Sequence, residues 1–365
     1  MSPVLKQDAI ELLRQLIEIP SFSREENLTA DLLIKFFEKN NVTVSRHLNN
    51  VWSVNQFYAP EKPTLLLNSH HDTVKPNPAY TRDPFKATLD GNILWGLGSN
   101  DAGGPLVSLI ATYLEFYNRK DLPFNLVLAA TAEEEISGVN GIEALWPGLP
   151  KIDFAIVGEP TKMDIAVAEK GLMVLDCITT GIAGHAAREE GVNAIYKALP
   201  DIEWFRTFKF PKVSESLGPI KMSVTVIHAG QAHNQVPPDC KFTVDVRATD
   251  MYTLEELYEI IRQHVGCSII PRSMRMRPSS ISMDHPLVKA ALNAGSKSYG
   301  SPTTSDQALI PVPSCKMGPG DSARSHSADE FILVDEIEKG IDRFIQMMND
   351  LAKLDLSALK GTQSK

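Results

Sequence analysis

Seven side chains that can bind a metal ion lie directly after apolar segments or in short loops rich in small residues. They are imidazoles and carboxylates, with no thiolate among them: His70, Asp72, Asp101, Glu134, Glu135, Glu159 and His326. Imidazole combined with carboxylate is typical of catalytic zinc, whereas structural zinc favours closely spaced cysteines. Cobalt and manganese accept the same ligands, so the pattern leaves the metal open. Two ions a few ångströms apart need a shared ligand, and the two oxygens of Asp101 suit that role.

Each of these motifs has an ordinary structural explanation when it is taken alone. An H-x-D such as residues 70–72 is more often a surface or capping pair, and three consecutive glutamates (133–135) usually form the solvated start of a helix. A single His326 is more often structural than a ligand. The loop "GSNDAGGP" (98–105) is not followed by GK[ST], which excludes a Walker A phosphate loop. Only the combination of the motifs favours a two-metal site.

Three of the motifs end short, continuous apolar runs, which are "TLLLNSHHD" (64–72), "NLVLAATAEEE" (125–135) and "DFAIVGEPT" (153–161). Such runs are typical of strands that are buried on both faces of a sheet covered by helices. A helical pattern lies between two of them, at 105–120, and the alternation of strand and helix predicts an α/β fold. Ligands bind at the carboxyl ends of strands in open sheets of this kind, and the polar clusters lie at those ends.

The middle of the chain has a different pattern. Segments 170–181, 220–230 and 240–250 alternate with the period of a strand, and 193–208 and 253–265 have helical spacing. This βαββαβ-like order predicts a small antiparallel α+β unit. After a return to mixed structure, the last clear helix is predicted at 335–354. We therefore predict a catalytic domain formed by 1–169 and 280–365, interrupted by an inserted domain at 170–279.

Composition narrows the class of protein. The chain has 365 residues, of which 43% are apolar and 22% charged, and its net charge is −9 with no block of Lys or Arg. Nucleic-acid binding and membrane-surface binding are therefore disfavoured. No apolar stretch reaches the ~18 residues of a membrane span, and charges interrupt the amphipathic N-terminal segment, which is not a signal peptide. Four scattered cysteines predict reduced thiols and a cytoplasmic protein.

The combined motifs resemble those of a di-zinc family that comprises aminoacylases, acetylornithine deacetylases, succinyl-diaminopimelate desuccinylases and related carboxypeptidases. The resemblance covers nearly the whole chain and is closest to the acetylornithine deacetylases. It rests on the H-x-D motif, the G-x-x-D turn, the paired glutamates, the GEPT motif and the late histidine, here His70-His71-Asp72, Gly98–Gly104, Glu134-Glu135, Gly158–Thr161 and His326. It implies a zinc-exopeptidase-like catalytic domain, a mixed sheet between helices, with an inserted ferredoxin-like α+β domain that forms a homodimer.

The resemblance also assigns roles to the metal-binding side chains. One Zn²⁺ would be held by His70, Asp101 and Glu159, and the second by Asp101, Glu135 and His326. Asp72 would hold His70 through its other ring nitrogen, a common arrangement for metal-bound imidazoles. Glu134 would be the general base. A cis peptide is implied after the bridging aspartate, between Asp101 and Ala102.

Three residues of the inserted domain have implied roles in substrate binding. His185, in "TTGIAGHAA", would stabilise the oxyanion in the active site of the partner subunit. Arg247 and Asn234 would bind the carboxylate of the substrate. Each has a structural alternative: His185 can be a plain loop histidine, and arginines on strands often pair with neighbouring acids.

The implied activity is hydrolysis of an N-acyl amino acid, with N-acetylornithine, N-acetylcitrulline or N-succinylornithine as candidate substrates, in arginine biosynthesis. An exopeptidase that cleaves di- or tripeptides on the same scaffold is the alternative. An inactive relative that only binds a ligand is disfavoured by the complete set of ligands and by Glu134. Three departures from the family pattern, Leu97 in place of Arg, Ile136 in place of Gly and the additional imidazole of His71, affect the expected pocket rather than the ligands.

Overall fold

The computed structural model describes residues 3–188, 190–356 and 359. Within these residues, contacts divide the chain into two compact units. Unit 1 comprises the chain up to Val167, Ser280–Tyr299 and the chain from Ser305 onward, and unit 2 comprises Ala168–Ser279 with Gly300–Thr304. The sequence predicts the insertion at 170–279. The short segment Gly300–Thr304 lies outside that range but also belongs to unit 2.

Unit 1 is built on a mixed sheet. In spatial order its strands are β1 (Ser45–His47), β2 (Asn50–Val54), β6 (Asn125–Thr131), β3 (Thr64–His70), β7 (Phe154–Val157), β17 (Ser314–Lys316) and β8 (Ile165–Glu169). The central strands β6, β3, β7 and β17 are parallel, whereas β2 and β8 are antiparallel to their neighbours. Two further short strands of this sheet, β15 (Ser279–Ser280) and β16 (Ser298–Ser301), both pair with β8. A smaller antiparallel sheet joins β4 (Thr88–Asp90), β5 (Ile93–Trp95) and β18 (Phe331–Leu333).

The apolar runs of the central strands are continuous because both faces of the sheet are covered. Successive side chains of a strand point to opposite faces. Leu65 and Leu67 accordingly pack into the larger core with the long helices, whereas Leu66 packs into a second core with Ile142 and Leu145 of the short helix α4 (Ile142–Leu145). The few polar residues within these strands, such as Asn68 of β3, are buried as well.

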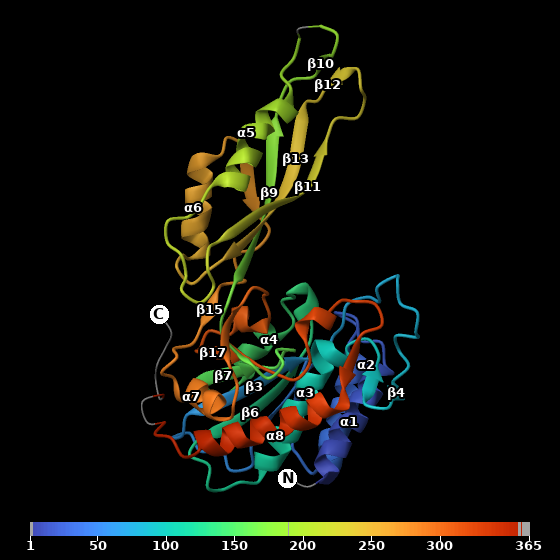
Figure 1. The fold of residues 1–365 in the computed structure, drawn as a ribbon, viewed down its shortest axis with the longest axis vertical. Coiled ribbons are helices and arrows are strands. Elements are labelled where there is room, and N and C mark those ends of the chain that lie inside the picture. Colours follow the sequence, from blue (N-terminus) through green and yellow to red (C-terminus); the bar gives the residue numbers. More distant parts are fainter. Residues whose placement is uncertain (1–2, 189, 357–358, 360–365) are drawn as a thin grey trace. The chain divides into compact units, whose positions relative to one another are not determined.

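Helices α1 (Pro3–Ile17), α3 (Gly104–Tyr117) and α8 (Val334–Leu351) cover the larger core, and α3 contacts both of the others (Figure 1). Two further helices of unit 1 are α2 (Asn27–Lys39) and α7 (Pro286–Asn293). Short helical turns are η1 (Ser99–Gly103), η2 (Glu134–Ile136), η3 (Trp146–Gly148), η4 (Asp306–Leu309) and η5 (Ser322–Arg324). Among the described residues, every helix is too short or too polar to cross a lipid bilayer.

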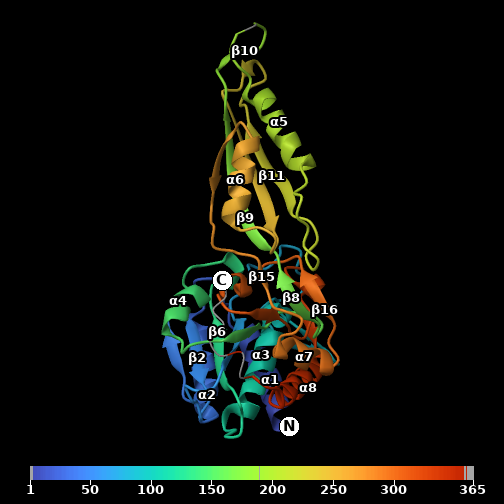
Figure 2. The ribbon, with the colours of Figure 1, turned by 90° about the vertical axis from the view of Figure 1, so that its left-hand side faces the viewer.

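Unit 2 is an antiparallel sheet with helices on one face (Figure 2). Its strand order is β11 (Lys221–Ala229), β13 (Asp239–Ala248), β9 (Gly171–Thr180) and β14 (Ser268–Pro271). Side chains of β9 and β13 alternate between buried and partly exposed, and the buried ones pack against α5 (Ala194–Thr207) and α6 (Leu254–His264). A separate ribbon pairs β10 (Gly184–His185) with β12 (Gln235–Val236). The predicted βαββαβ-like order implies a strand after the second helix but names no residues for it; β14 occupies that place.

Candidate metal centre

Parallel strands bring four of the predicted residues to one edge of the sheet of unit 1. His70 is the last residue of β3, Glu134 and Glu135 follow β6, and Glu159 follows β7. The three strands are neighbours that run in the same direction, with His70 opposite Thr131 in the register. Their carboxyl ends therefore open on the same side, which is where ligands bind in sheets of this kind.

The other two predicted ligands come from loops. Asp101 lies in η1, the turn that connects β5 to α3, and the peptide bond between Asp101 and Ala102 is cis, as the resemblance implies. His326 lies between η5 and β18 and has a left-handed backbone, with φ of 58°. These two loops approach the strand ends from outside the sheet, so no hydrophobic periodicity in the sequence places them there.

Within the described chain, two groups of three side chains bring their ligand atoms within 4.8 Å of one another. One group is His70, Asp101 and Glu159, and the other is Asp101, Glu135 and His326. Asp101 belongs to both groups. These are the same residues, in the same two sets, that the resemblance names as ligands of a pair of ions.

The chemistry of the two groups fits divalent cations. Nε2 of His70 lies 3.3 Å from Oδ1 of Asp101 and 3.8 Å from Oε1 of Glu159, and Nε2 of His326 lies 3.0 Å from Oε2 of Glu135 and 3.7 Å from Oδ2 of Asp101. Each imidazole thus presents one nitrogen to carboxylate oxygens from other loops. His70 is only 1% exposed, and charges removed from water need opposite charges close by. Carboxylates outnumber imidazoles in this cluster, which leaves negative charge for cations to neutralise.

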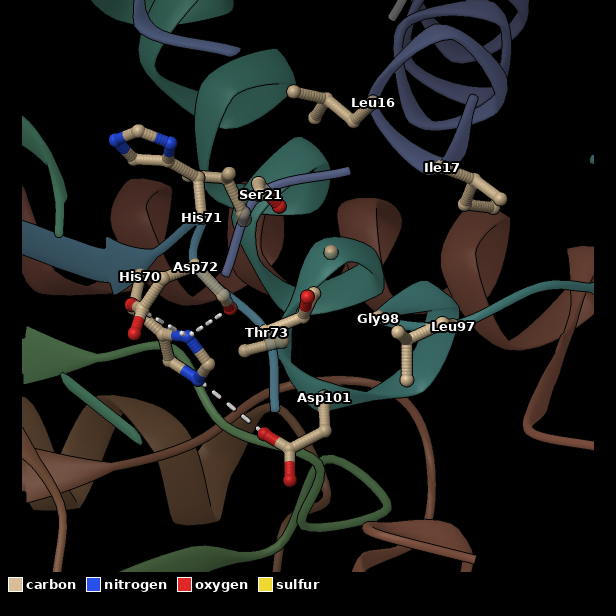
Figure 3. Close-up of a pocket in the computed structure, with 13 residues that line it drawn as sticks. Leu16, Ile17, Ser21, His70, His71, Asp72, Thr73, Leu97, Gly98 and Asp101 are labelled. Atoms are coloured by element: carbon tan, nitrogen blue, oxygen red, sulfur yellow. Dashed lines mark hydrogen bonds and ion pairs between the residues drawn. The ribbon is translucent and has the colours of Figure 1, made fainter. Parts of the chain in front are cut away.

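Asp72 contacts both the histidine ligand, as Figure 3 shows, and the glutamate turn. Nδ1 of His70 lies 3.0 Å from the backbone oxygen of Asp72 and 3.4 Å from its Oδ1, which leaves Nε2 to face Asp101. The Asp72 carboxylate also accepts hydrogen bonds from the backbone N–H groups of Glu134 (3.1 Å) and Glu135 (3.2 Å), and from Oγ of Ser23 (2.6 Å). The sequence predicts the contact with His70 but not the contacts with the glutamate turn.

Electrostatics distinguish Glu134 from the ligands. Burial raises the pKa of Glu134 well above its usual value, the charge of His70 acts in the opposite direction, and the carboxylates of Glu159 and Asp306 raise the pKa further. Oε2 of Glu134 lies 3.8 Å from Nε2 of His70, yet Glu134 stands outside both ligand groups. A largely buried carboxyl that lies beside both groups but belongs to neither is suitably placed to act as a general base.

Glu133, the first of the three consecutive glutamates, has a different function from its neighbours. Its backbone is left-handed, with φ of 57°, which turns the chain between the strand end and Glu134. The Glu133 carboxylate accepts hydrogen bonds from the side-chain amide (2.8 Å) and the backbone N–H (3.4 Å) of Asn140. Its backbone N–H donates to the buried Glu26. Glu133 therefore closes the loop that carries the next two glutamates.

The three departures from the family pattern lie in different environments. The ring of His71 points away from His70 (Figure 3) and lies within hydrogen-bonding distance of Thr29 Oγ1 (2.9 Å) and the backbone oxygen of Asn49 (3.0 Å). Burial lowers the pKa of His71 to about 4, so the ring is neutral. Leu97 is buried and lines the same small cavity as Leu16. Ile136, in contrast, is 47% exposed directly after Glu135.

Asp306 connects the two strands that carry His70 and the glutamates. It is buried, and its Oδ2 accepts hydrogen bonds from the side chains of Asn68 in β3 (2.9 Å) and Thr131 in β6 (2.7 Å). Polar residues within otherwise apolar strands were the signal for this contact, because a buried amide and hydroxyl require partners.

The predicted substrate-binding residues of unit 2 occupy two separate places within that unit. His185 and Asn234 lie together at the β10–β12 ribbon, where the backbone N–H of Ala186 donates to the backbone oxygen of Asn234 and the N–H of Ala187 donates to Nδ1 of His185. Arg247 lies at the opposite end of β13 and donates to the carboxylate of Asp245 (2.9 and 3.1 Å). The structural pairing that is common for strand arginines is therefore present at Arg247.

The family model for peptidase family M20/M25/M40 matches residues 66–350 of this chain. The chain belongs to this family. This match confirms the family that the sequence motifs predict, and the structure confirms the predicted α/β fold with a mixed sheet between helices. The protein is accordingly a hydrolase of amide bonds, and its family is one of metal-dependent amidohydrolases and peptidases.

Several relatives match over most of their length. A putative [LysW]-lysine/[LysW]-ornithine hydrolase from Pyrobaculum aerophilum is 28% identical, over 91% of this chain and 94% of the relative. An acetylornithine deacetylase from Buchnera aphidicola subsp. Schizaphis graminum is 26% identical, over 88% of this chain and 92% of the relative. Among solved structures, an M20 family metallo-carboxypeptidase from Sulfolobus solfataricus shares the fold, with a TM-score of 0.74, 18% identity and coverage of 97% and 100% of the two chains.

Proposed function

We propose that this M20 hydrolase removes the acyl group from an N-acyl amino acid with the help of two Zn²⁺ ions, and that N-acetylornithine is its substrate. The observation that carries this proposal is the position of Glu134: a largely buried carboxyl lies 3.8 Å from His70 and beside two groups of metal-binding side chains that share Asp101. N-acetylcitrulline and N-succinylornithine are the related substrates that we consider. Hydrolysis of these compounds places the enzyme in arginine biosynthesis, and we propose a cytoplasmic location for it.

The ligand groups determine where the ions would be held. His70, Asp101 and Glu159 would hold one ion, and Asp101, Glu135 and His326 the other. Co²⁺ or Mn²⁺ would also be accepted by these oxygen and nitrogen donors. When bound, zinc polarises a carbonyl and lowers the pKa of a water molecule to roughly 7.

The protein's own residues then transfer the proton. Glu134 takes a proton from the water that attacks the amide carbon and delivers it to the nitrogen as the C–N bond breaks. Asp72 keeps the turn of Glu134 and Glu135 in place through their backbone N–H groups. His185 would donate a hydrogen bond to the oxyanion, because the negative charge that develops on the carbonyl oxygen requires a donor beyond the ions.

Substrate recognition is the less supported part of the proposal. The guanidinium of Arg247 donates to Asp245 and to Oγ1 of Thr304 (3.4 Å), but its five N–H donors exceed the three that these contacts use. The remaining N–H groups would bind the substrate carboxylate, together with the side chain of Asn234. Relatives named as acetylornithine deacetylases and [LysW]-ornithine hydrolases support ornithine as the amine part of the substrate.

We also propose that unit 2 forms a homodimer. Its strand β11 is at the edge of the sheet, and an edge strand offers unpaired N–H and C=O groups to another chain. Exposed apolar side chains lie along β11 and on the helix α5, which contacts it: Tyr196 is 71% exposed, Leu199 53% and Ile227 52%. Pairing of two β11 edges, with these side chains buried between the subunits, would remove both the open edge and the apolar surface.

A substrate panel tests the proposal. The zinc-loaded protein should have its highest kcat/KM on N-acetylornithine among N-acetylcitrulline, N-succinylornithine, LysW-linked ornithine and a set of di- and tripeptides. A chelator should abolish the activity, and added zinc should restore it. Preference for the peptides would replace the proposal with the exopeptidase alternative, which the peptidase family supports. No turnover of any amide by the zinc-loaded protein would favour the inactive ligand-binding alternative.

A further inference from the structure

A buried glutamate that belongs to neither ligand group connects the loops of Asp101 and His326. Glu330 follows His326 by four residues and is 2% exposed. Its Oε1 accepts hydrogen bonds from the backbone N–H groups of Asn100 (2.8 Å) and Asp101 (2.9 Å), and its Oε2 accepts from the N–H of Gly98 (3.0 Å). One carboxylate thus accepts three backbone donors from the turn that carries the shared ligand.

The backbone of Glu330 is attached to the same region. Its carbonyl oxygen accepts a hydrogen bond from the N–H of Gly96 (3.0 Å), and its own N–H donates to Oη of Tyr80 (3.3 Å). Asn100 provides a second connection, because its side chain both accepts from the N–H of Asp321 (2.9 Å) and donates to the oxygen of Asp321 (3.1 Å). Residues 96–101 are therefore joined to the chain on both sides of His326.

The turn needs this support because its backbone departs from helical geometry at Asp101 and Ala102. Asp101 has φ of −118° and ψ of 96°, outside the helical range, although it lies directly before α3. Its N–H and those of Gly98 and Asn100 would be unsatisfied donors in a buried region without the Glu330 carboxylate, and such donors are costly. A neutral amide side chain cannot provide two acceptor oxygens to three donors, which explains a buried acid here.

We propose that Glu330 is a positioning residue for Asp101: by holding the turn Gly98–Asp101 it directs the two Asp101 oxygens toward the two ligand groups. The inference rests on the proposed two-metal function. A residue that orients a metal ligand changes metal affinity when it is replaced, typically by about 10–100-fold. A residue that only stabilises the fold changes the unfolding temperature and leaves the metal affinity of the folded protein unchanged.

The experiment compares Glu330→Gln and Glu330→Asp with Asp329→Asn. The first variant replaces an acceptor oxygen with a donor, and the second keeps the carboxyl group but shortens the side chain. Asp329 is the matched control because its carboxylate also accepts three hydrogen bonds, from the backbone N–H groups of Thr81 and Arg82 and from Oγ1 of Thr81, but none from the turn of Asp101. Circular dichroism of the metal-free proteins establishes that each variant is folded at the temperature of the titration.

Competition with a chromogenic chelator then measures the dissociation constants for zinc, and the visible spectrum of the cobalt-loaded protein reports the ligand geometry. We expect both Glu330 variants to bind zinc about 10–100-fold more weakly and to show an altered cobalt spectrum, with Asp329→Asn close to the wild type. Wild-type affinity and spectrum in the Glu330 variants, or an equal loss in Asp329→Asn, would overturn the inference.

Two further outcomes are also decisive. If Glu330→Gln does not fold, the affinity and spectrum of Glu330→Asp decide by the same criteria. A wild-type protein that binds no zinc would refute the two-metal function, and this inference with it. A wild-type protein that binds two ions, combined with unaffected Glu330 variants, would refute this inference alone.

Discussion

Replacing Glu134 with glutamine tests the mechanism most directly. The amide has the shape of the carboxyl but cannot accept a proton, so Glu134→Gln removes the base and leaves the surrounding contacts nearly unchanged. The ligand atoms of both groups belong to other residues, and the Glu134 backbone N–H that donates to Asp72 is retained. Zinc content should therefore remain that of the wild type.

The expected loss of rate follows from the role of the base. General acid–base catalysis contributes about 10²–10⁴-fold, which corresponds to roughly 2.7–5.5 kcal/mol at about 1.36 kcal/mol for each factor of ten. The loss should be in kcat rather than in KM, because the proton moves only as the bond is made and broken.

The neighbouring Glu133 provides the matched control. Glu133→Gln makes the same chemical change one residue earlier, and the glutamine oxygen can still accept from Asn140. Its loss of activity should be much smaller than that of Glu134→Gln, because the Glu133 carboxyl contacts Asn140 and takes no part in the proton transfer. Steady-state kinetics on N-acetylornithine, with zinc measured by atomic absorption, check both variants. Equal activity of Glu134→Gln and the wild type, at equal zinc content, would refute the assignment of the base.

Three other predictions address different parts of the molecule. If His185 completes the site of the partner subunit, mixing the inactive His185→Ala and Glu134→Gln proteins should restore activity as hybrid dimers form. Each hybrid has one intact site, so up to about one quarter of wild-type activity should return. No recovery after verified subunit exchange would contradict this. His326 is 58% exposed whereas His70 is 1% exposed, so the ion held by His326 should leave first under limiting chelator, and a single-step loss of both ions would argue against this order. Burial lowers the pKa of His285 to about 4, below the value of about 6.5 in the unfolded chain. The contribution of the neutral ring to the free energy of unfolding is therefore fully present above pH ~6.5 and decreases by about 1–2 kcal/mol between pH ~6.5 and ~4. This decrease is smaller than the full pKa shift would give, because the ring is partly exposed. His285→Asn keeps an N-cap for α7, and its urea unfolding should lose less stability than the wild type over that range; equal pH dependence would show that His285 titrates normally.

The strand ends of unit 1 were predictable from sequence for a simple physical reason. Buried parallel strands appear as continuous apolar runs, and their carboxyl ends share one edge of the sheet. The positions of His70 and Glu159 follow from that rule, because each comes at the end of such a run. Asp101 and His326 do not obey it: they lie in loops, and only the resemblance to a family associated them with the strand ends.

The contacts that hold the ligands were much less accessible to prediction. The turn at Glu133 depends on a left-handed backbone, for which a glutamate gives no signal, since glycine and asparagine are the residues that usually indicate it. Asp72 and Glu330 act through hydrogen bonds to backbone N–H groups, and the sequence does not reveal where those groups point. For Arg247 the resemblance implies a substrate contact, and the structure adds a pair with Asp245, two residues away on the same strand, that the sequence did not specify.

The excess of acid at the strand ends is best explained by function. Asp101, Glu134, Glu135 and Glu159 surround His70 and His326, and uncompensated charges in a buried region oppose folding. A sequence selected for stability alone would place apolar or amide side chains there. Departures from local stability rules that occur together at one edge of a well-packed sheet are expected where chemistry takes place. The two cations that would neutralise these acids are the same ions that would activate the amide, so the proposed reaction and the stability of this edge depend on the same ligands.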